Sequence, residues 1–111
     1  MKECSGEFLY YLNSDDVIQP GVFSFINNYI SAHPNFDVYY GHGYMTYGPL
    51  NEKFKIYSIK WNVLQYINHL VPIVQQSTFI KIKAVNFIGG FNESNYTQWD
   101  GELIVDLELN D

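Results

Sequence analysis

Residues 7–16, Glu-Phe-Leu-Tyr-Tyr-Leu-Asn-Ser-Asp-Asp, form an apolar and aromatic run that ends in two adjacent carboxylates. The part from 7 to 13 has no helical period, and Phe, Tyr and Leu favour a pleated, covered surface, so it predicts a β-strand buried on both faces. In an open α/β sheet, ligands gather at the carboxyl ends of the strands. Asp15 and Asp16 would therefore lie where a ligand or a divalent cation is held.

The two carboxylates have a second interpretation. Asp is common in turns and at helix N-caps, because its short side chain accepts hydrogen bonds from backbone N–H groups a few residues further on. A helix is expected directly afterwards, with Pro20 in its first turn, where a missing N–H costs little. Capping and metal binding both remain open, and one Asp can cap while the other binds.

The composition describes one small acidic domain. The chain has 111 residues, 47% of them hydrophobic and 18% aromatic, which is enough for one core and too few for two. Twelve acidic residues against six basic ones give a formal charge of −6, which argues against a nucleic-acid surface. All six cations are Lys, so a phosphate site here would rely on a bound cation, backbone N–H groups or Lys instead of an Arg fork.

Cysteine content and hydropathy bear on the compartment. Cys4 is the single cysteine and cannot form an internal disulfide, which fits a reducing environment. No uncharged apolar run approaches the roughly 18 to 20 residues that a membrane-spanning helix needs. We expect a cytoplasmic protein without a transmembrane segment, and attachment to a membrane surface stays open.

The next part of the chain predicts a helix and a second strand. Residues 19–32 place apolar side chains at the spacing of one helical face, and Pro34 ends the pattern. Residues 37–40 predict a strand, which residues 44–47 would continue after a break at Gly41-His42-Gly43. His42 has the character of an ordinary loop residue. The region that follows, up to residue 60, predicts a solvated loop face carrying three lysines, Lys53, Lys55 and Lys60.

The last part predicts two helices around a strand. Apolar spacing indicates a short helix over 61–70 and a longer one over 97–109. Between them, residues 73–82 predict a strand with a polar centre, which either passes beneath a polar cavity or lies at a sheet edge. Residues 83–88 predict a helical turn that Gly89-Gly90 closes. In the last helix, the early acids Asp100 and Glu102 have a simple explanation in the helix dipole.

Taken in order, several stretches resemble family 2 glycosyltransferases of the GT-A fold. The resemblance covers nearly the whole chain and lies in Ser-Gly-Glu-Phe-Leu-Tyr-Tyr-Leu-Asn-Ser-Asp-Asp at 5–16, Pro-Gly at 20–21 before a helix, a strand ending in Tyr-Gly at 40–41, Gln-Gln-Ser-Thr-Phe-Ile at 75–80, Gly-Gly-Phe-Asn-Glu at 89–93 and Trp-Asp-Gly-Glu-Leu at 99–103. It implies an α/β fold, with residues 1–111 as a single truncated segment of a GT-A catalytic domain. The implied segment is the C-terminal half, a mixed sheet with flanking helices that lacks the N-terminal βαβ nucleotide-binding part.

The same resemblance implies roles for individual residues. Asp15 would be the ligand of a divalent cation, Mn or Mg, that bridges the diphosphate of a nucleotide-sugar. Asn13 would lie by the nucleotide ribose, Asp16 would support the loop, and Gln76 matches a Gln in the strand below the site. Asp100 would be the catalytic base. The sequence departs from the family at Asn13, where many members carry Asp, and near the other motifs at two positions: Gln75, where His is frequent, and Trp99, where another acid is often found.

The implied activity is a metal-dependent, inverting transfer of a sugar from a nucleotide-sugar donor to a hydroxyl of a glycan or lipid-linked acceptor, as in bacterial-type polysaccharide synthesis. It requires Asp15 and Asp100 to share one cleft. The alternative is an inactive fragment that packs against a partner or associates with itself through the exposed edge of its first strand.

Overall fold

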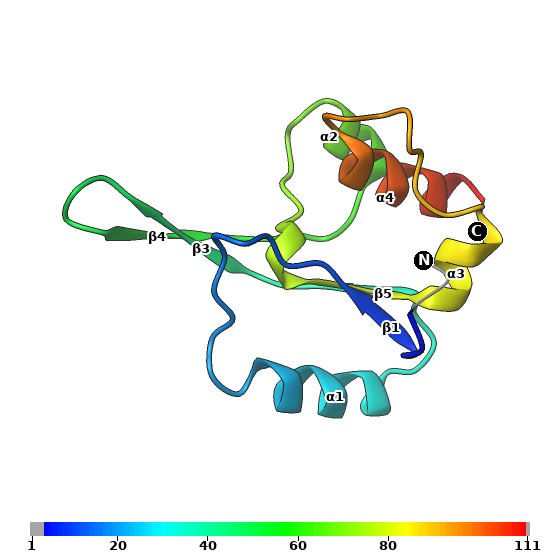
Figure 1. The fold of residues 1–111 in the computed structure, drawn as a ribbon, viewed down its shortest axis with the longest axis horizontal. Coiled ribbons are helices and arrows are strands. Elements are labelled where there is room, and N and C mark those ends of the chain that lie inside the picture. The colour runs from blue at the N-terminus through cyan, green and yellow to red at the C-terminus, as the bar shows by residue number, and fades with distance from the viewer. Residues whose placement is uncertain (1–3, 111) are drawn as a thin grey trace.

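The computed structural model describes residues 4–110, and its centre is a three-stranded antiparallel sheet with helices on both faces (Figure 1). The strand order is β1-β5-β2, and a separate two-stranded sheet pairs β3 with β4. Along the chain the elements are β1 (Phe8–Tyr10), α1 (Val22–Ala32), β2 (Val38–Tyr40), β3 (Gly43–Tyr47), β4 (Glu52–Ile56), α2 (Val63–Ile67), the 3-10 turn η1 (Gln75–Ser77), β5 (Thr78–Lys81), α3 (Ile82–Phe87) and α4 (Trp99–Leu109).

The two faces of the central sheet differ in side-chain type. Phe79 of β5 lies opposite Tyr10 and Tyr39, which makes an aromatic face, and Phe23 of α1 packs on it with its ring 5.7 Å from that of Tyr10. On the other face Ile80 lies opposite Leu9 of β1 and Val38 of β2. This aliphatic face meets α3 and α4 in the main core, whose buried members are Ile80, Val85, Leu103 and Ile104.

The first helix ends where the sequence predicts but begins at Val22, three residues later than expected, so Pro20 precedes the helix and is not in its first turn. Gly21 precedes it in the left-handed region (φ 82°), and the Gly21 carbonyl accepts a hydrogen bond from the Phe25 N–H at 2.9 Å. The helix ends at His33, and Pro34 follows. Its inward positions, Val22, Ile26 and Ile30, are only half-buried, so α1 covers the aromatic face loosely.

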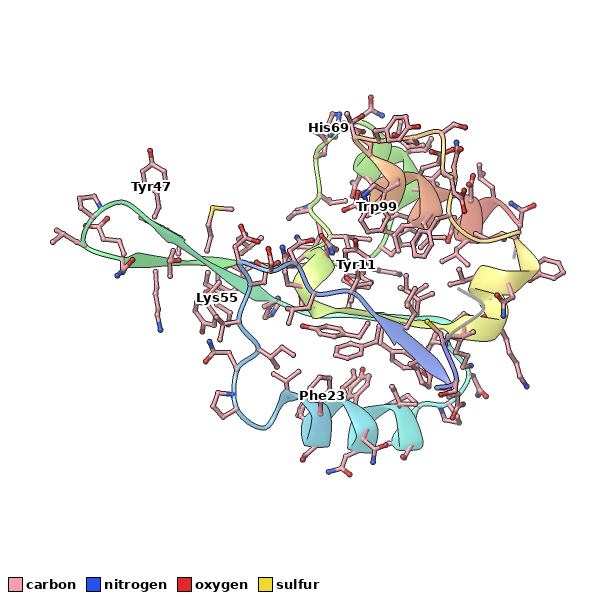
Figure 2. The ribbon with its side chains drawn as sticks, viewed as in Figure 1. Tyr11, Phe23, Tyr47, Lys55, His69 and Trp99 are labelled. Carbon is pink, nitrogen blue, oxygen red and sulfur yellow. The ribbon has the colours of Figure 1, made fainter. Side chains whose placement is uncertain are left out.

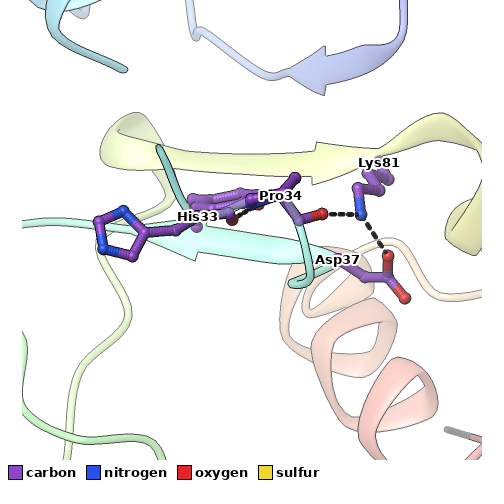
Figure 3. Close-up of polar contacts among 5 residues, drawn as sticks. His33, Pro34, Asp37 and Lys81 are labelled. Atoms are coloured by element: carbon purple, nitrogen blue, oxygen red, sulfur yellow. Dashed lines mark hydrogen bonds and ion pairs between the residues drawn. The ribbon is translucent and has the colours of Figure 1, made fainter. Parts of the chain in front are cut away.

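The connection from α1 to β2 is held by Lys81 at the end of β5. Its Nζ donates to the Pro34 carbonyl at 2.9 Å and lies 3.2 Å from Oδ1 of Asp37 (Figure 3). The Lys81 backbone N–H also donates to the Asp37 carbonyl at 2.8 Å. The Tyr39 hydroxyl donates to the His33 carbonyl within the same turn. One lysine therefore joins the helix end, the turn and two strands.

Residues 43–56 form a hairpin, so the expectation that 44–47 would extend the second strand is wrong. β3 and β4 pair with each other, joined by a turn over 48–51, and project from the rest of the chain (Figure 1). Gly48 and Asn51 take left-handed conformations in this turn (φ 73° and 50°). The solvated loop expected before residue 60 is in part the strand β4, although its lysines do face solvent.

The predicted strand over 73–82 is shorter than expected, and it is not an edge. Residues 75–77 form the turn η1, and only Thr78–Lys81 is a strand, at the centre of the sheet. The strand at 7–13 is likewise reduced to three half-buried residues, because β1 has a sheet partner on one side only among the described residues. Every pairing is antiparallel, whereas a mixed sheet was expected.

The helices of the second half are confirmed in position. α2 is shorter than predicted and begins at Asn62, whose side chain accepts the Gln65 N–H at 2.9 Å. α3 ends before Gly89 and Gly90, both with positive φ. α4 buries Leu103 and Ile104, as its periodicity predicts. None of the helices within residues 4–110 is long and apolar enough to cross a membrane.

Candidate functional site

The carboxyl ends of β1 and β2 lie at the same end of the sheet, because both strands run antiparallel to β5 between them. The turn η1 lies at this end of the sheet and is hydrogen-bonded to β1 and to the residue after β2. The Tyr10 hydroxyl donates to the Gln76 carbonyl at 2.8 Å, and the Gly41 N–H donates to the Ser77 carbonyl at 3.0 Å. The end of the first strand and the segment that follows the second are thus both joined to η1.

The side chain of Gln75 in η1 lies against the segment that follows β1. Its Oε1 accepts a long hydrogen bond of 3.4 Å from Asn13 Nδ2, and its Nε2 lies 3.5 Å from the Tyr11 carbonyl. Gln76 was the expected site residue. It is placed in the turn instead of in a strand, and the hydrogen bond it makes there is through its backbone carbonyl. The hydrogen bond between their side chains therefore brings Asn13 and Gln75, not Gln76, together.

Asp15 and Asp16 lie in a tight turn after β1, closed by a hydrogen bond of 3.2 Å from the Asp16 N–H to the Asn13 carbonyl. Asp15 is exposed. Asp16 is half-buried, and its Oδ2 is fully covered without a hydrogen-bond partner. Neither carboxylate caps α1, whose N-cap is Gly21 without a side-chain bond. Burial raises the pKa of the Tyr10 phenol, and the negative charge of Asp16 adds to that rise.

Asp100 lies in the first turn of α4, where the helix dipole favours a negative charge. Its Oδ1 accepts the Gly101 N–H at 2.9 Å. The neighbouring Tyr66 of α2 has its pKa raised, first by burial and then by the charge of Asp100. A Cβ on residue 101 would come to 3.0 Å from the Tyr66 hydroxyl, so the glycine permits this close approach of the two helices.

A contact between aromatic rings joins the acidic turn to the start of α4. The rings of Tyr11 and Trp99 lie 4.5 Å apart, and the two residues face each other in Figure 2. Phe91 packs on the other side of Trp99, with ring centroids 5.2 Å apart. Two segments remote in sequence thus meet at this contact. Tyr11 lies two residues before Asn13, and Trp99 lies one residue before Asp100.

Two cavities lie beside Asp100. The first, of about 40 Å³, lies among Tyr11, Gln75, Trp99 and Asp100, and is too small for a sugar ring. The second is an open hollow of about 720 Å³ between α2 and α4, within the size range of small-molecule sites. Its polar lining is Tyr66, His69, Asn95, Thr97, Gln98, Asp100 and Glu102. Gln75 and Asp100 line the first cavity, and Asn13 lies beside it only through its hydrogen bond to Gln75. Asp15 and Asp16 line neither cavity, so the structure does not place Asp15 and Asp100 in one cleft, although the implied activity requires it.

The loop before α4 is held by Glu102. Its two carboxylate oxygens accept hydrogen bonds from the side-chain amides of Asn92, at 2.8 Å, and of Asn95. The hydrogen bond from Asn95, and then that from Asn92, lowers the pKa of Glu102. Asn95 Oδ1 also accepts the Gln98 N–H at 3.0 Å, so this asparagine orders the entry to the helix.

The acidic turn fits a magnesium or manganese ion only in part. Among residues 4–110, no three His, Cys, Asp or Glu side chains are grouped closely enough to hold a metal by themselves. Mg²⁺ commonly binds through one or two carboxylates, with substrate phosphates and water completing its shell. The exposed Asp15 and the unpartnered oxygen of Asp16 supply such a pair. Comparison of the chain with protein-family models, curated proteins and solved structures finds no match.

The sequence reasoning missed the residues that form the hollow. Tyr66 lies within the helix expected over 61–70 but was not singled out, and Asn95 fell in no expected element. His69 has a left-handed backbone (φ 57°) that turns the chain after α2 along the rim of the hollow. Asn92 and Asn95 lie just before α4, whose first turn carries Asp100 and Glu102. This pattern was the available signal for the ordered loop, because Asn side chains near a helix start can hydrogen-bond to an acid in its first turn.

Proposed function

We propose that this chain belongs to a metal-dependent, inverting glycosyltransferase and carries its acceptor side. The observation that carries the proposal is the position of Asp100, a carboxyl group at a helix N-terminus on the rim of an open, polar-lined hollow of about 720 Å³. The contact between Tyr11 and Trp99 supports it, because it joins that rim to the segment that leads into the acidic turn. The motif order described above supports the family.

In this proposal Asp100 accepts the proton of an acceptor hydroxyl in the hollow. As the hydroxyl oxygen attacks the anomeric carbon, its proton passes to a carboxylate oxygen of Asp100, and the bond from the anomeric carbon to the diphosphate oxygen breaks. One displacement inverts the anomeric centre. A bound divalent cation would neutralise charge on the departing diphosphate, and Asp15 and Asp16 are the residues that would hold it.

The chemistry of the hollow fits a hydroxyl-rich acceptor. Asn95, Gln98 and Glu102 offer amide donors and carboxylate acceptors, and Val71 and Pro72 add apolar surface. Sugars have both hydroxyl groups and apolar ring faces, so this combination suits them. Asn95 and Glu102 hold each other in place, which preorganises the polar edge of the hollow.

The test separates binding from turnover. Calorimetry with Mn²⁺ and a nucleoside diphosphate should show binding to the wild type, loss of binding in Asp15→Ala, and unchanged binding in Asp100→Asn. Sugar transfer from a panel of nucleotide-sugars should fall by about 100-fold or more in Asp100→Asn, because a positioned base contributes that much.

Asp106→Asn is the matched control, since Asp106 lies in the same helix outside the lining of the hollow. Binding of the diphosphate that is equal in wild type and Asp15→Ala, or absent from both, would rule out the proposed donor site. Normal transfer by Asp100→Asn would remove its role as the base.

A packing module is the second candidate, favoured by strand edges that have no partner within the described residues. β1 and β2 each pair on one side only, and both are three residues long. Sedimentation analysis over a range of concentrations tests this function. A dimer that Leu9→Pro and Val38→Pro in the edge strands abolish supports it, and a monomer at all concentrations contradicts it.

A further inference from the structure

The hairpin β3–β4 has two exposed faces of different chemistry. Residues directly opposite in the register share a face, which places Met45, Tyr47, Phe54 and Glu52 on one side, with Glu52 opposite Tyr47. The other side carries Tyr44, Thr46, Lys53 and Lys55. Tyr47 and Lys55 project from these opposite faces in Figure 2. One face of the hairpin is therefore apolar apart from Glu52, and the other is basic and aromatic.

Within residues 4–110 nothing covers the outer part of this hairpin. The exposed fractions are 52% for Phe54, 54% for Met45, 74% for Tyr47 and 81% for Leu50 in the turn. The hairpin is anchored only at its base, where the Ser58 hydroxyl donates to the Gly41 carbonyl at 2.6 Å. Two-stranded hairpins are marginally stable alone in water, and grouped exposed apolar residues mark interaction sites.

The charges of the hairpin indicate what covers it. Lys53 and Lys55 are two of the six cations of the chain, and Glu52 is the one acid between residues 43 and 57. This is a locally positive segment on a chain of formal charge −6. The Lys55 Nζ lies 4.8 Å from the centre of the Tyr57 ring, so its stem runs along apolar surface while the amine stays accessible.

We propose that the tip of this hairpin docks on a membrane surface that contains anionic lipids. Tyr47, Leu50 and Phe54 enter the boundary between headgroups and acyl chains, where Tyr is favoured because one end is apolar and the other wet. Lys53 and Lys55 reach the lipid phosphates from the opposite face. This inference is independent of the proposed transferase activity, because it uses none of the residues of that site.

A second copy of the chain fits the hairpin less well. The exposed parts of Met45, Tyr47 and Phe54 offer roughly 300–400 Å² on the face that they share, at about 200 Å² for a whole side chain, whereas stable protein interfaces need about 800 Å² per partner. A bilayer requires no such matched area. The acidic body does not prevent the approach, because a strand of five residues extends about 17 Å, twice the screening length of about 8 Å at physiological salt.

Cosedimentation with vesicles tests the proposal directly. The wild-type chain should bind phosphatidylcholine vesicles that contain phosphatidylglycerol, more weakly at high salt, and should bind pure phosphatidylcholine poorly. Lys53→Gln with Lys55→Gln should weaken binding about 25-fold, at about fivefold per lysine. Tyr47→Ser with Leu50→Ser should weaken it at least about 10-fold.

The matched controls lie on α3, far from the hairpin in Figure 1: Lys83→Gln, and Phe87→Ser, where Phe87 is 77% exposed. Both should bind as the wild type does. Failure of the wild type to bind anionic vesicles, or equal binding by hairpin and control variants, overturns the proposal. A hairpin-dependent dimer without lipid would assign the face to a second copy and overturn it as well.

Trypsin gives a second readout that needs no variant. The chain has six Lys and no Arg, so trypsin can cut it only at known positions, two of which are in the hairpin. Anionic vesicles should slow cleavage after Lys53 and Lys55 and leave cleavage after Lys83 unchanged, as followed by mass spectrometry. Equal cleavage of the hairpin with and without vesicles contradicts membrane docking.

Discussion

Glu102 is the residue on which the order of the loop before α4 depends. Hydrogen bonds from Asn95 and Asn92 favour its charged form and lower its pKa. A carboxyl whose pKa is lower in the folded state stabilises the fold above its ordinary pKa of about 4.3, and this stabilisation is lost as the pH falls through the lower, folded value. The rim of the hollow should therefore loosen in acid.

The hydrogen bond from Asn95 lowers the pKa of Glu102 more than the hydrogen bond from Asn92 does, and this order gives a prediction. Asn95→Ala should move the pKa of Glu102 back toward its ordinary value by more than Asn92→Ala does, because the Asn95 bond is the larger cause. Carbon-13 NMR of the Glu102 carboxyl as a function of pH measures this. Glu93, a nearby acid of the same loop, serves as the reference that should not change. A larger effect from Asn92→Ala would contradict the assignment.

At the scale of elements, Lys81 links α1, β2 and β5 through one side chain. Lys81→Met keeps the apolar stem but removes the bond to Pro34 and the ion pair, and should cost about 1 kcal/mol in the free energy of unfolding. Asp37→Asn should cost a few tenths of that, since Asp37 is half-exposed and its ion pair is screened by solvent.

Urea unfolding measures both effects. Lys83→Met, two residues further on and exposed, should leave the midpoint unchanged. If Asp37→Asn destabilised the chain as much as Lys81→Met, the ion pair and not the bond to Pro34 would be what holds the turn.

The elements also show what the sequence could and could not predict. The helices were predictable because Leu103 and Ile104 follow the helical period onto a buried face. The hairpin was missed because Tyr44–Tyr47 and Glu52–Ile56 both alternate weakly, although the four-residue turn between them is a hairpin signal. Thr78 was read into a longer strand because polar residues before it are consistent with either a strand or a turn.

For the whole molecule, burial raises the pKa values of Tyr10, Tyr40 and Tyr66. The folded chain then keeps these phenols neutral at a pH where the unfolded chain ionises. The contribution of these phenols to stability should be constant up to about pH 10 and should fall above it. Thermal melts followed by circular dichroism from neutral to alkaline pH measure this loss. Tyr66→Phe should reduce it, whereas Tyr96→Phe, which changes an 89% exposed residue, should not.

Only some residues of the candidate site could be singled out from the sequence. The motifs single out Asn13 and Asp100, which lie beside a strand end and at a helix start, but they select Gln76 where the structure places Gln75 against Asn13. The hollow could not be predicted, because it arises from the packing of α2 against α4 at Gly101, which depends on tertiary contacts. The turn with Asp15 and Asp16 lies outside that hollow for the same reason: the path of the chain between β1 and α1 is set by contacts with η1.

The strand order of the central sheet has a consequence for folding during synthesis. β1 and β2 do not pair with each other, and the strand that joins them, β5, is made some forty residues after β2 at roughly 5–20 residues per second. Until then Phe8, Tyr10 and Tyr39 have no sheet partner, and the nascent chain exposes two aromatic strands on the ribosome. Such delayed, long-range pairing slows folding. Chaperone capture of nascent chains should accordingly peak before residues 78–81 emerge and decline once they do.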